Sequence, residues 1–194
     1  MDVVWRNGQL VFFGHAAFPG GITANLLWAA SSVFFLLLLL LAEKKQSKFW
    51  KMAFMYLYIL HMPNASYLFL ELKHLVLKDG IADKLSALPV FVFGTLSITG
   101  LVLSIAQTYV VATKITPLNK YPQISILMLS ALSGWGAILG LMELLSPTGI
   151  FYPQVVIEYT MRAPIYLVMV GIAVSFVTTG GTLLTYRIIN KRPG

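Results

Sequence analysis

The feature that most constrains this chain is the length of its apolar runs. Residues 22–42 carry no charged side chain, and one helical crossing of a bilayer needs about 20 consecutive apolar residues. Four further, mainly apolar runs follow at about residues 50–72, 85–113, 123–145 and 164–188. The sequence therefore predicts an all-α, polytopic transmembrane helix bundle of about five spans, in a single transmembrane domain covering residues 1–194.

Composition points the same way. Charged residues make up 11% of the chain, against about 25% in soluble domains. The 14 lysines and arginines lie in loops, where they act as topology signals, and no basic stripe is interleaved with aromatic residues. We therefore expect the lipid bilayer and other membrane subunits as partners, and no nucleic acid. The absence of cysteine excludes disulfides, thiolate nucleophiles and cysteine metal sites within the chain.

Loop charge also predicts orientation. Residues 1–21 form an extramembrane tail, because they are too interrupted to span a bilayer. If this tail lies outside, most basic residues fall on the cytoplasmic side, as the positive-inside tendency requires. The inside set is Lys44, Lys45, Lys48, Lys51, Lys114, Lys120, Arg187, Lys191 and Arg192, and the outside set is Arg6, Lys73, Lys78, Lys84 and Arg162. The prediction is an outside N-terminus and a cytoplasmic C-terminus.

The second span differs from the others because it carries many polar residues. Residues 56–75 read YLYILHMPNASYLFLELKHL, and polar side chains inside hydrocarbon usually face other helices or a cavity. Pro63 predicts a kink, either as an opening to a cavity or as a structural kink satisfied by Asn64 and Ser66. The candidate ligand-binding residues of this span are His61, Asn64, Tyr67, Glu71 and His74.

His61 is the histidine that this topology places near mid-membrane, about 15 Å from Lys51 at 1.5 Å per residue. A neutral imidazole could ligate a single pigment, so a pigment at His61 is the one cofactor that we consider. A bis-histidine haem would need a second buried histidine, and His15 and His74 are too shallow. The favoured alternative is a histidine that hydrogen-bonds to a neighbouring helix. Ionisable residues inside a membrane are nevertheless functional candidates by default.

Glu71 and His74 form an E-x-x-H pattern, whose spacing serves di-metal carboxylate sites. Such a site needs the motif twice and two further carboxylates, whereas this chain has one copy, with Glu143 and Glu158 as same-side acids. The favoured interpretation is a polar helix end, and we predict no metal site. No catalytic residue is predicted either, because nucleophile-elbow and phosphate-loop motifs are absent.

Small residues mark the predicted helix contacts. Gly136 and Gly140 form a GxxxG pattern in the fourth span, beside Ser133 and Gly134, and the third span places Gly100 and Ser104 on one face. Small residues let membrane helices approach closely. Residues 34–41, almost pure Phe and Leu, carry no small residue, and we expect them to face lipid.

Three segments resemble a family of bacterial integral membrane proteins known as domain of unknown function 1361. The family motif PNAPYLxTDLxHL is similar to residues 63–75, PNASYLFLELKHL, with Glu71 where the family has Asp. Residues 99–104 resemble a segment like TGLxxGxxSL, and residues 133–140, SGWGAILG, resemble the start of SGFGIYLGRFLRWNSWD. The chain then departs, with leucines at 141 and 144 where the family carries arginine. The resemblance implies a helical membrane fold and no particular activity.

Two classes of function follow. The first, which we favour, is a non-catalytic accessory or scaffold subunit of a larger membrane complex, with a pigment or other cofactor as a variant. Its basis is the small size, the short loops and the small-residue faces. The second is a small transporter or intramembrane enzyme that acts on a lipid or a small polar molecule around the kinked span. A closed polar cavity beside Pro63 would distinguish the second from the first.

Overall fold

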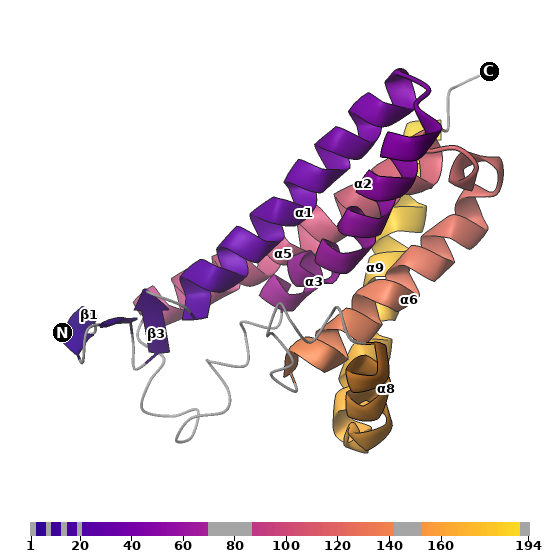
Figure 1. The fold of residues 1–194 in the computed structure, drawn as a ribbon. Coiled ribbons are helices and arrows are strands. Elements are labelled where there is room, and N and C mark those ends of the chain that lie inside the picture. Colours follow the sequence, from indigo (N-terminus) through magenta and orange to yellow (C-terminus); the bar gives the residue numbers. More distant parts are fainter. Residues whose placement is uncertain are drawn as a thin grey trace.

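A computed structural model describes residues 3–6, 9–12, 15–18, 21–69, 87–141 and 153–190. The helices are α1 (Gly21–Lys44), α2 (Lys48–His61), α3 (Pro63–Phe69), α5 (Ala87–Lys114), α6 (Pro122–Leu141), α8 (Pro153–Arg162) and α9 (Ile165–Asn190). A short 3-10 helix, η2 (Leu118–Lys120), lies between α5 and α6. In Figure 1 the long helices lie side by side as an elongated bundle, with α8 beside the end of α6.

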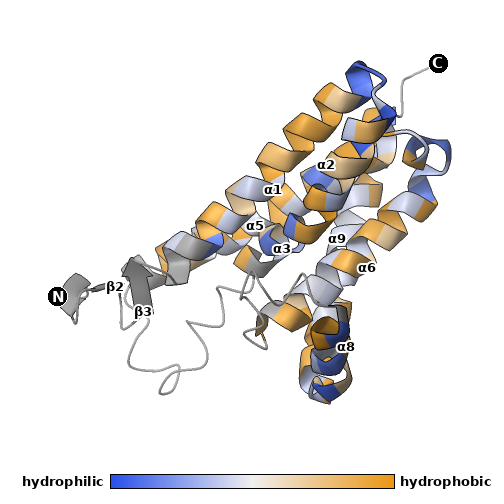
Figure 2. Ribbon diagram, in the orientation of Figure 1, coloured by the Kyte–Doolittle hydropathy of each residue, from blue (hydrophilic) through white to orange (hydrophobic). Residues whose placement is uncertain are grey.

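Four of the described helices contain stretches long and apolar enough to cross a membrane. These stretches are Asn25–Lys44 in α1, Val90–Lys114 in α5, Pro122–Leu139 in α6 and Ile165–Asn190 in α9. The second predicted span is divided between α2 and α3 at Pro63. Figure 2 shows hydrophobic residues along these helices and hydrophilic ones gathered at the turns and on α8. The predicted fold class, a polytopic helical membrane bundle with a kinked second span, is confirmed.

The helix ends rich in lysine and arginine meet at one end of the bundle. The backbone N–H of Thr116, just after α5, donates to Glu43 at the end of α1 across 3.2 Å. Tyr186, near the end of α9, packs against a buried cluster that contains Ile115 and Tyr58. We call this end the basic end, and it carries Lys44, Lys45, Lys48, Lys51, Lys114, Lys120 and Arg187.

The apolar core near the basic end is built from four elements. Leu39 of α1, Tyr58 of α2, Val111 of α5 and Ile126 of α6 are all fully buried in one cluster. Each of these residues lies on the face of its helix that points into the core, while large apolar side chains cover the outer face of the helix. Such a helix is apolar all round, as expected for a membrane span.

The expectation that residues 34–41 face lipid is wrong for part of the run. Phe34, Leu37 and Leu41 are more than half exposed, but Leu36 and Leu39 are buried against α2 and α5. One turn of an α-helix contains 3.6 residues, so the side chains of a long run point to all sides of the helix. α1 therefore gives one stripe to the core and another to the outside.

The N-terminal tail contains a small antiparallel sheet that was not predicted from the sequence. Strands β1 (Val3–Arg6), β2 (Gln9–Phe12) and β3 (His15–Phe18) pair in that order, with Val3 opposite Phe12 and Phe12 opposite His15. Residues 3–6 and 9–12 include valine, tryptophan and phenylalanine, which favour strands. Towards the other end of the chain, α8 is a short separate helix that precedes α9.

Candidate functional site

The break in the second span is a capped kink. Proline has no N–H to donate and its ring clashes with the preceding turn, so α2 ends at His61 and α3 begins at Pro63. Met62 keeps helical backbone angles, φ −54° and ψ −40°, and its N–H donates to the Tyr58 carbonyl across 2.7 Å. The Asn64 side-chain amide donates to the His61 carbonyl across 3.0 Å. Asn64 therefore satisfies a carbonyl that the break exposes.

His61 is held between two aromatic rings of α1. Its imidazole stacks on Phe35 with ring centroids 4.7 Å apart and on Trp28 with centroids 5.4 Å apart. Because both faces of the imidazole are covered, a ligand could approach only at the ring edge. Nδ1 is buried and has no hydrogen-bond partner among the described residues. Among the described residues, Nδ1 therefore does not make the expected hydrogen bond to a neighbouring helix.

Three serine hydroxyls from three helices meet beyond the break. Ser66 of α3 contacts Ser104 of α5 across 3.0 Å and hydrogen-bonds to Ser133 of α6, and Ser104 lies 3.1 Å from Ser133. We call these three residues the serine cluster. All of them are buried. A crevice beside the cluster, lined also by Val174 and Thr178, is too narrow to admit a water molecule.

Two glycines allow the helices to approach closely around this cluster. Gly136 faces Pro63 so closely that an added methyl group would overlap the proline ring. Gly134 faces Gly171 of α9, and a methyl group there would overlap the Gly171 carbonyl oxygen. Of the other residues expected in helix contacts, Gly100 is buried and Gly140 lies in α6.

Part of the candidate site lies outside the described residues. Glu71 and His74 both fall in residues 70–86, so the E-x-x-H hypothesis stays a prediction. Tyr67 lies in α3. Among the residues that the structure describes, no group of three or more His, Cys, Asp or Glu side chains could hold a metal ion.

The structure also contains a set of buried polar groups outside the predicted site residues. The hydroxyls of Tyr58, Thr108, Ser130 and Thr178 and Oε1 of Gln107 have no hydrogen-bond partner within the described residues. The Gln107 amide nitrogen does donate to Ser32 of α1 across 3.0 Å. Buried polar groups in proteins are nearly always paired. The spacing of Ser104, Gln107 and Thr108 along α5 is a helical polar stripe that could have been recognised.

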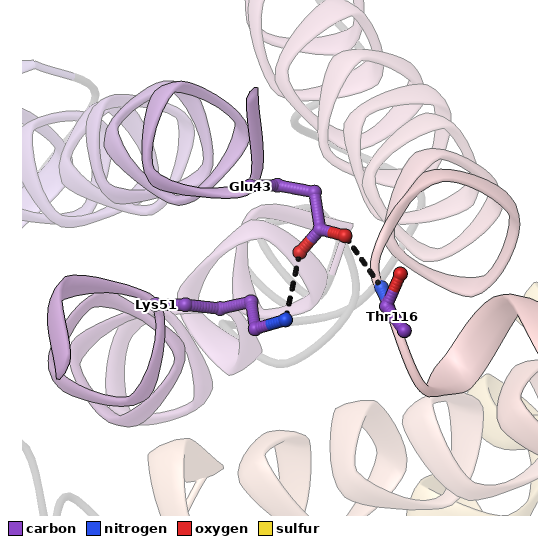
Figure 3. A network of polar contacts seen from close by, with 3 residues as sticks. All are labelled: Glu43, Lys51 and Thr116. Atoms are coloured by element: carbon purple, nitrogen blue, oxygen red, sulfur yellow. Dashed lines mark hydrogen bonds and ion pairs between the residues drawn. The ribbon is translucent and has the colours of Figure 1, made fainter. Parts of the chain in front are cut away.

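One acidic residue joins three elements at the basic end (Figure 3). The Glu43 carboxylate lies 3.2 Å from Lys51 Nζ on α2 and accepts the Thr116 N–H on its other oxygen. The side chains of Lys51 and Glu43 are 25% and 21% exposed, so water screens their attraction only in part. Glu43 thus ties the end of α1 to the start of α2 and to the turn after α5.

α8 is tied to the opposite end of the bundle. Trp135 Nε1 of α6 donates to the Thr160 hydroxyl across 2.9 Å. Glu158 and Arg162 pair one helical turn apart, at 2.7 Å, and both side chains are more than half exposed. The charged pair gives α8 a polar face, as expected of a helix that lies in the membrane interface.

In the comparison with known proteins, the chain matches one protein family. The family described as "Protein of unknown function (DUF1361)" matches residues 25–182. No curated protein and no solved structure matches the chain. The matched region includes the kinked span, the serine cluster and the Glu43 contacts.

Proposed function

The chain belongs to the DUF1361 family, whose members have no assigned activity, and we propose from its own geometry that it is a non-catalytic subunit or scaffold of a larger membrane complex. One observation carries the proposal: Asn64 and Ser66, two polar residues of the kinked span, are used for packing within the bundle. Asn64 caps the kink, and Ser66 is held by Ser104 and Ser133. The adjoining crevice admits no water.

The outer face of α5 is the surface that we assign to a membrane partner. No atom of the described residues lies within 4 Å of a methyl group added at Gly94, and Thr95 and Thr99 are exposed one helical turn apart. Ile98, between them, is 66% exposed. Membrane helices associate through small residues that allow close approach. The large apolar side chains elsewhere on the bundle suit lipid better than a close helix contact.

The first test is purification in a gentle detergent, with a native mass and an absorption spectrum from the same sample. A scaffold subunit should elute with other chains, at a mass well above 21.5 kDa plus detergent. The T95F/T99F double variant should release those chains, because phenylalanine at both positions prevents close approach. The control is I124F/M128F, which adds the same rings to an exposed pair on α6. A protein that elutes as one chain, or equal release by both variants, would contradict the proposal.

A second candidate is a small transporter or intramembrane enzyme for a lipid or small polar molecule. The hydroxyls of Tyr58, Thr108 and Thr178 support it, because they have no hydrogen-bond partner among the described residues and a solute with hydrogen-bonding groups could satisfy them. This candidate predicts a single-chain particle that releases a small molecule on denaturation, detected by mass spectrometry. Visible absorbance that disappears in His61→Leu would instead support the pigment variant of the scaffold proposal.

The proposed orientation keeps the N-terminus outside and places the basic end in the cytoplasm. The chain contains no cysteine, so single cysteines report accessibility without background. In intact cells, a membrane-impermeant maleimide should label Glu158→Cys on α8. Gln46→Cys, in the turn between α1 and α2, should be labelled only after permeabilisation. The reverse labelling pattern would exclude this orientation.

A further inference from the structure

We propose that the turn between α1 and α2 binds the headgroup of an anionic phospholipid, through Lys44, Lys45 and Lys48. This proposal does not depend on the scaffold function, because it concerns the lipid leaflet and not a protein partner. The turn is tight: Gln46 adopts φ 53°, and the Ser47 N–H donates back to the Ala42 carbonyl across 3.2 Å. Three lysines are thus held within five consecutive positions of a closed turn.

These three lysines are free to meet an anion. Lys44, Lys45 and Lys48 are exposed, and within the described part of the chain none of them forms an ion pair. The acid of this turn, Glu43, is instead turned toward Lys51 and Thr116. Its carboxylate therefore neutralises the lysine on the inner side of the turn and leaves the outer lysines uncompensated.

The neighbouring side chains place the three lysines at the depth of lipid headgroups. Phe49 and Met52 at the start of α2 are 72% and 74% exposed. Trp50, also exposed, has its ring centroid 5.3 Å from that of Phe49 and 5.4 Å from that of Phe54. Exposed tryptophan at a span end marks the membrane interface. A lysine directly beside such an anchor lies where a phosphate group lies, so charge and depth complement an anionic lipid.

The test measures which lipid lies against Trp50. The protein is reconstituted in vesicles that contain brominated phosphatidylglycerol or brominated phosphatidylcholine at equal mole fraction. Bromine quenches tryptophan on contact, and the difference between the wild type and Trp50→Phe isolates the signal of Trp50. We expect phosphatidylglycerol to be preferred at this position by roughly fivefold at low salt, the effect of about one lysine near an anionic surface. The preference should weaken at high salt, because exposed charges are screened.

Matched triple variants distinguish a local site from the general field of the basic end. K44Q/K45Q/K48Q should abolish the preference for phosphatidylglycerol. K114Q/K120Q/R187Q removes the same charge from the same end and should leave the preference at Trp50 largely intact. Equal quenching by the two lipids in the wild type would overturn the proposal, and so would an equal loss in both triple variants. All variants carry surface changes and are compared only if their gel-filtration profiles match the wild type.

Discussion

Replacing Gly134 with alanine tests the close contact between α6 and α9 directly. The added methyl group would overlap the carbonyl oxygen of Gly171 and lie 3.1 Å from its carbonyl carbon. These are main-chain atoms, so no side-chain rotation relieves the overlap, and the helices must separate by about 1 Å to regain normal contact. Overpacking of this kind costs about 1–3 kcal/mol. Since the overlapping atoms belong to the main chain, we take the upper end of this range, about 3 kcal/mol. Alanine regains about 0.5–1 kcal/mol as a better helix former, so we expect a net loss of about 2 kcal/mol.

For a chain of this length, 2 kcal/mol lowers the unfolding temperature by about 4–8 °C. The measurement is thermal unfolding in detergent, followed by circular dichroism. Gly180→Ala is the matched control: Gly180 lies on the exposed side of α9, and no atom in the part of the chain that the structure describes lies within 4 Å of a methyl group added there. The control should melt at the wild-type temperature or slightly above it. If Gly134→Ala and Gly180→Ala melt together, the helices do not meet at Gly134 as described.

Three further changes test single contacts by the same melting assay. Glu43→Ala removes both the Lys51 ion pair and a hydrogen-bond acceptor, so it should lower the free energy of unfolding by about 1–2 kcal/mol. Glu43→Gln keeps the acceptor and should lower it by about half of that. Equal losses in the two variants would mean that the hydrogen bond from the Thr116 N–H contributes nothing. Ser133→Ala should cost only about 0.6 kcal/mol, the average for hydrogen bonds between membrane helices, while Ser133→Leu should cost more than 2 kcal/mol through overpacking; the opposite ranking would contradict a closely packed serine cluster. His61→Ala should lower the free energy of unfolding by about 1–3 kcal/mol, because it removes ring stacking that His61→Phe retains. If His61→Phe is as unstable as His61→Ala, the imidazole nitrogens matter and the stacked ring does not.

The long helices could be predicted because the bilayer imposes length and polarity together. Residues 22–42 and 164–188 were recognisable as spans from uninterrupted apolar character, and α1 and α9 lie there. The kink was predictable as well, since Pro63 cannot donate a hydrogen bond whatever surrounds it. The N-terminal sheet carried a signal that the sequence reading did not use: Asn7-Gly8 lies between β1 and β2, and this dipeptide is a strong hairpin signal.

The buried side of α1 could not be predicted from its sequence. Leu36 and Leu37 are chemically identical, yet Leu36 is 7% exposed and Leu37 is 55% exposed. In a soluble helix, polar residues would mark the outside, but a membrane span is apolar on both sides because lipid tails are as apolar as the core. Only the position of α2 and α5 decides which leucine is buried.

In the candidate site too, single residues could be recognised from the sequence, whereas the contacts between them could not. From sequence alone, Ser66, Ser104 and Ser133 were polar or small residues on separate spans, and nothing in their spacing showed that they meet. His61 was recognised as unusual, but its stacking on Trp28 and Phe35 depends on the angle between α1 and α2. The hypotheses for Glu71 and His74 stay predictions.

What the sequence determined by itself is local: span lengths, the kink at Pro63 and the concentration of lysine in the turns. Each follows from one segment meeting lipid or water, without reference to the rest of the chain. The tertiary structure decided which polar groups pair and which glycines touch, because those outcomes depend on the distance and rotation between helices. The Glu43 contact with Thr116 shows the difference: 73 residues separate the two partners, and only the packing of α1 against α5 brings them within 3.2 Å.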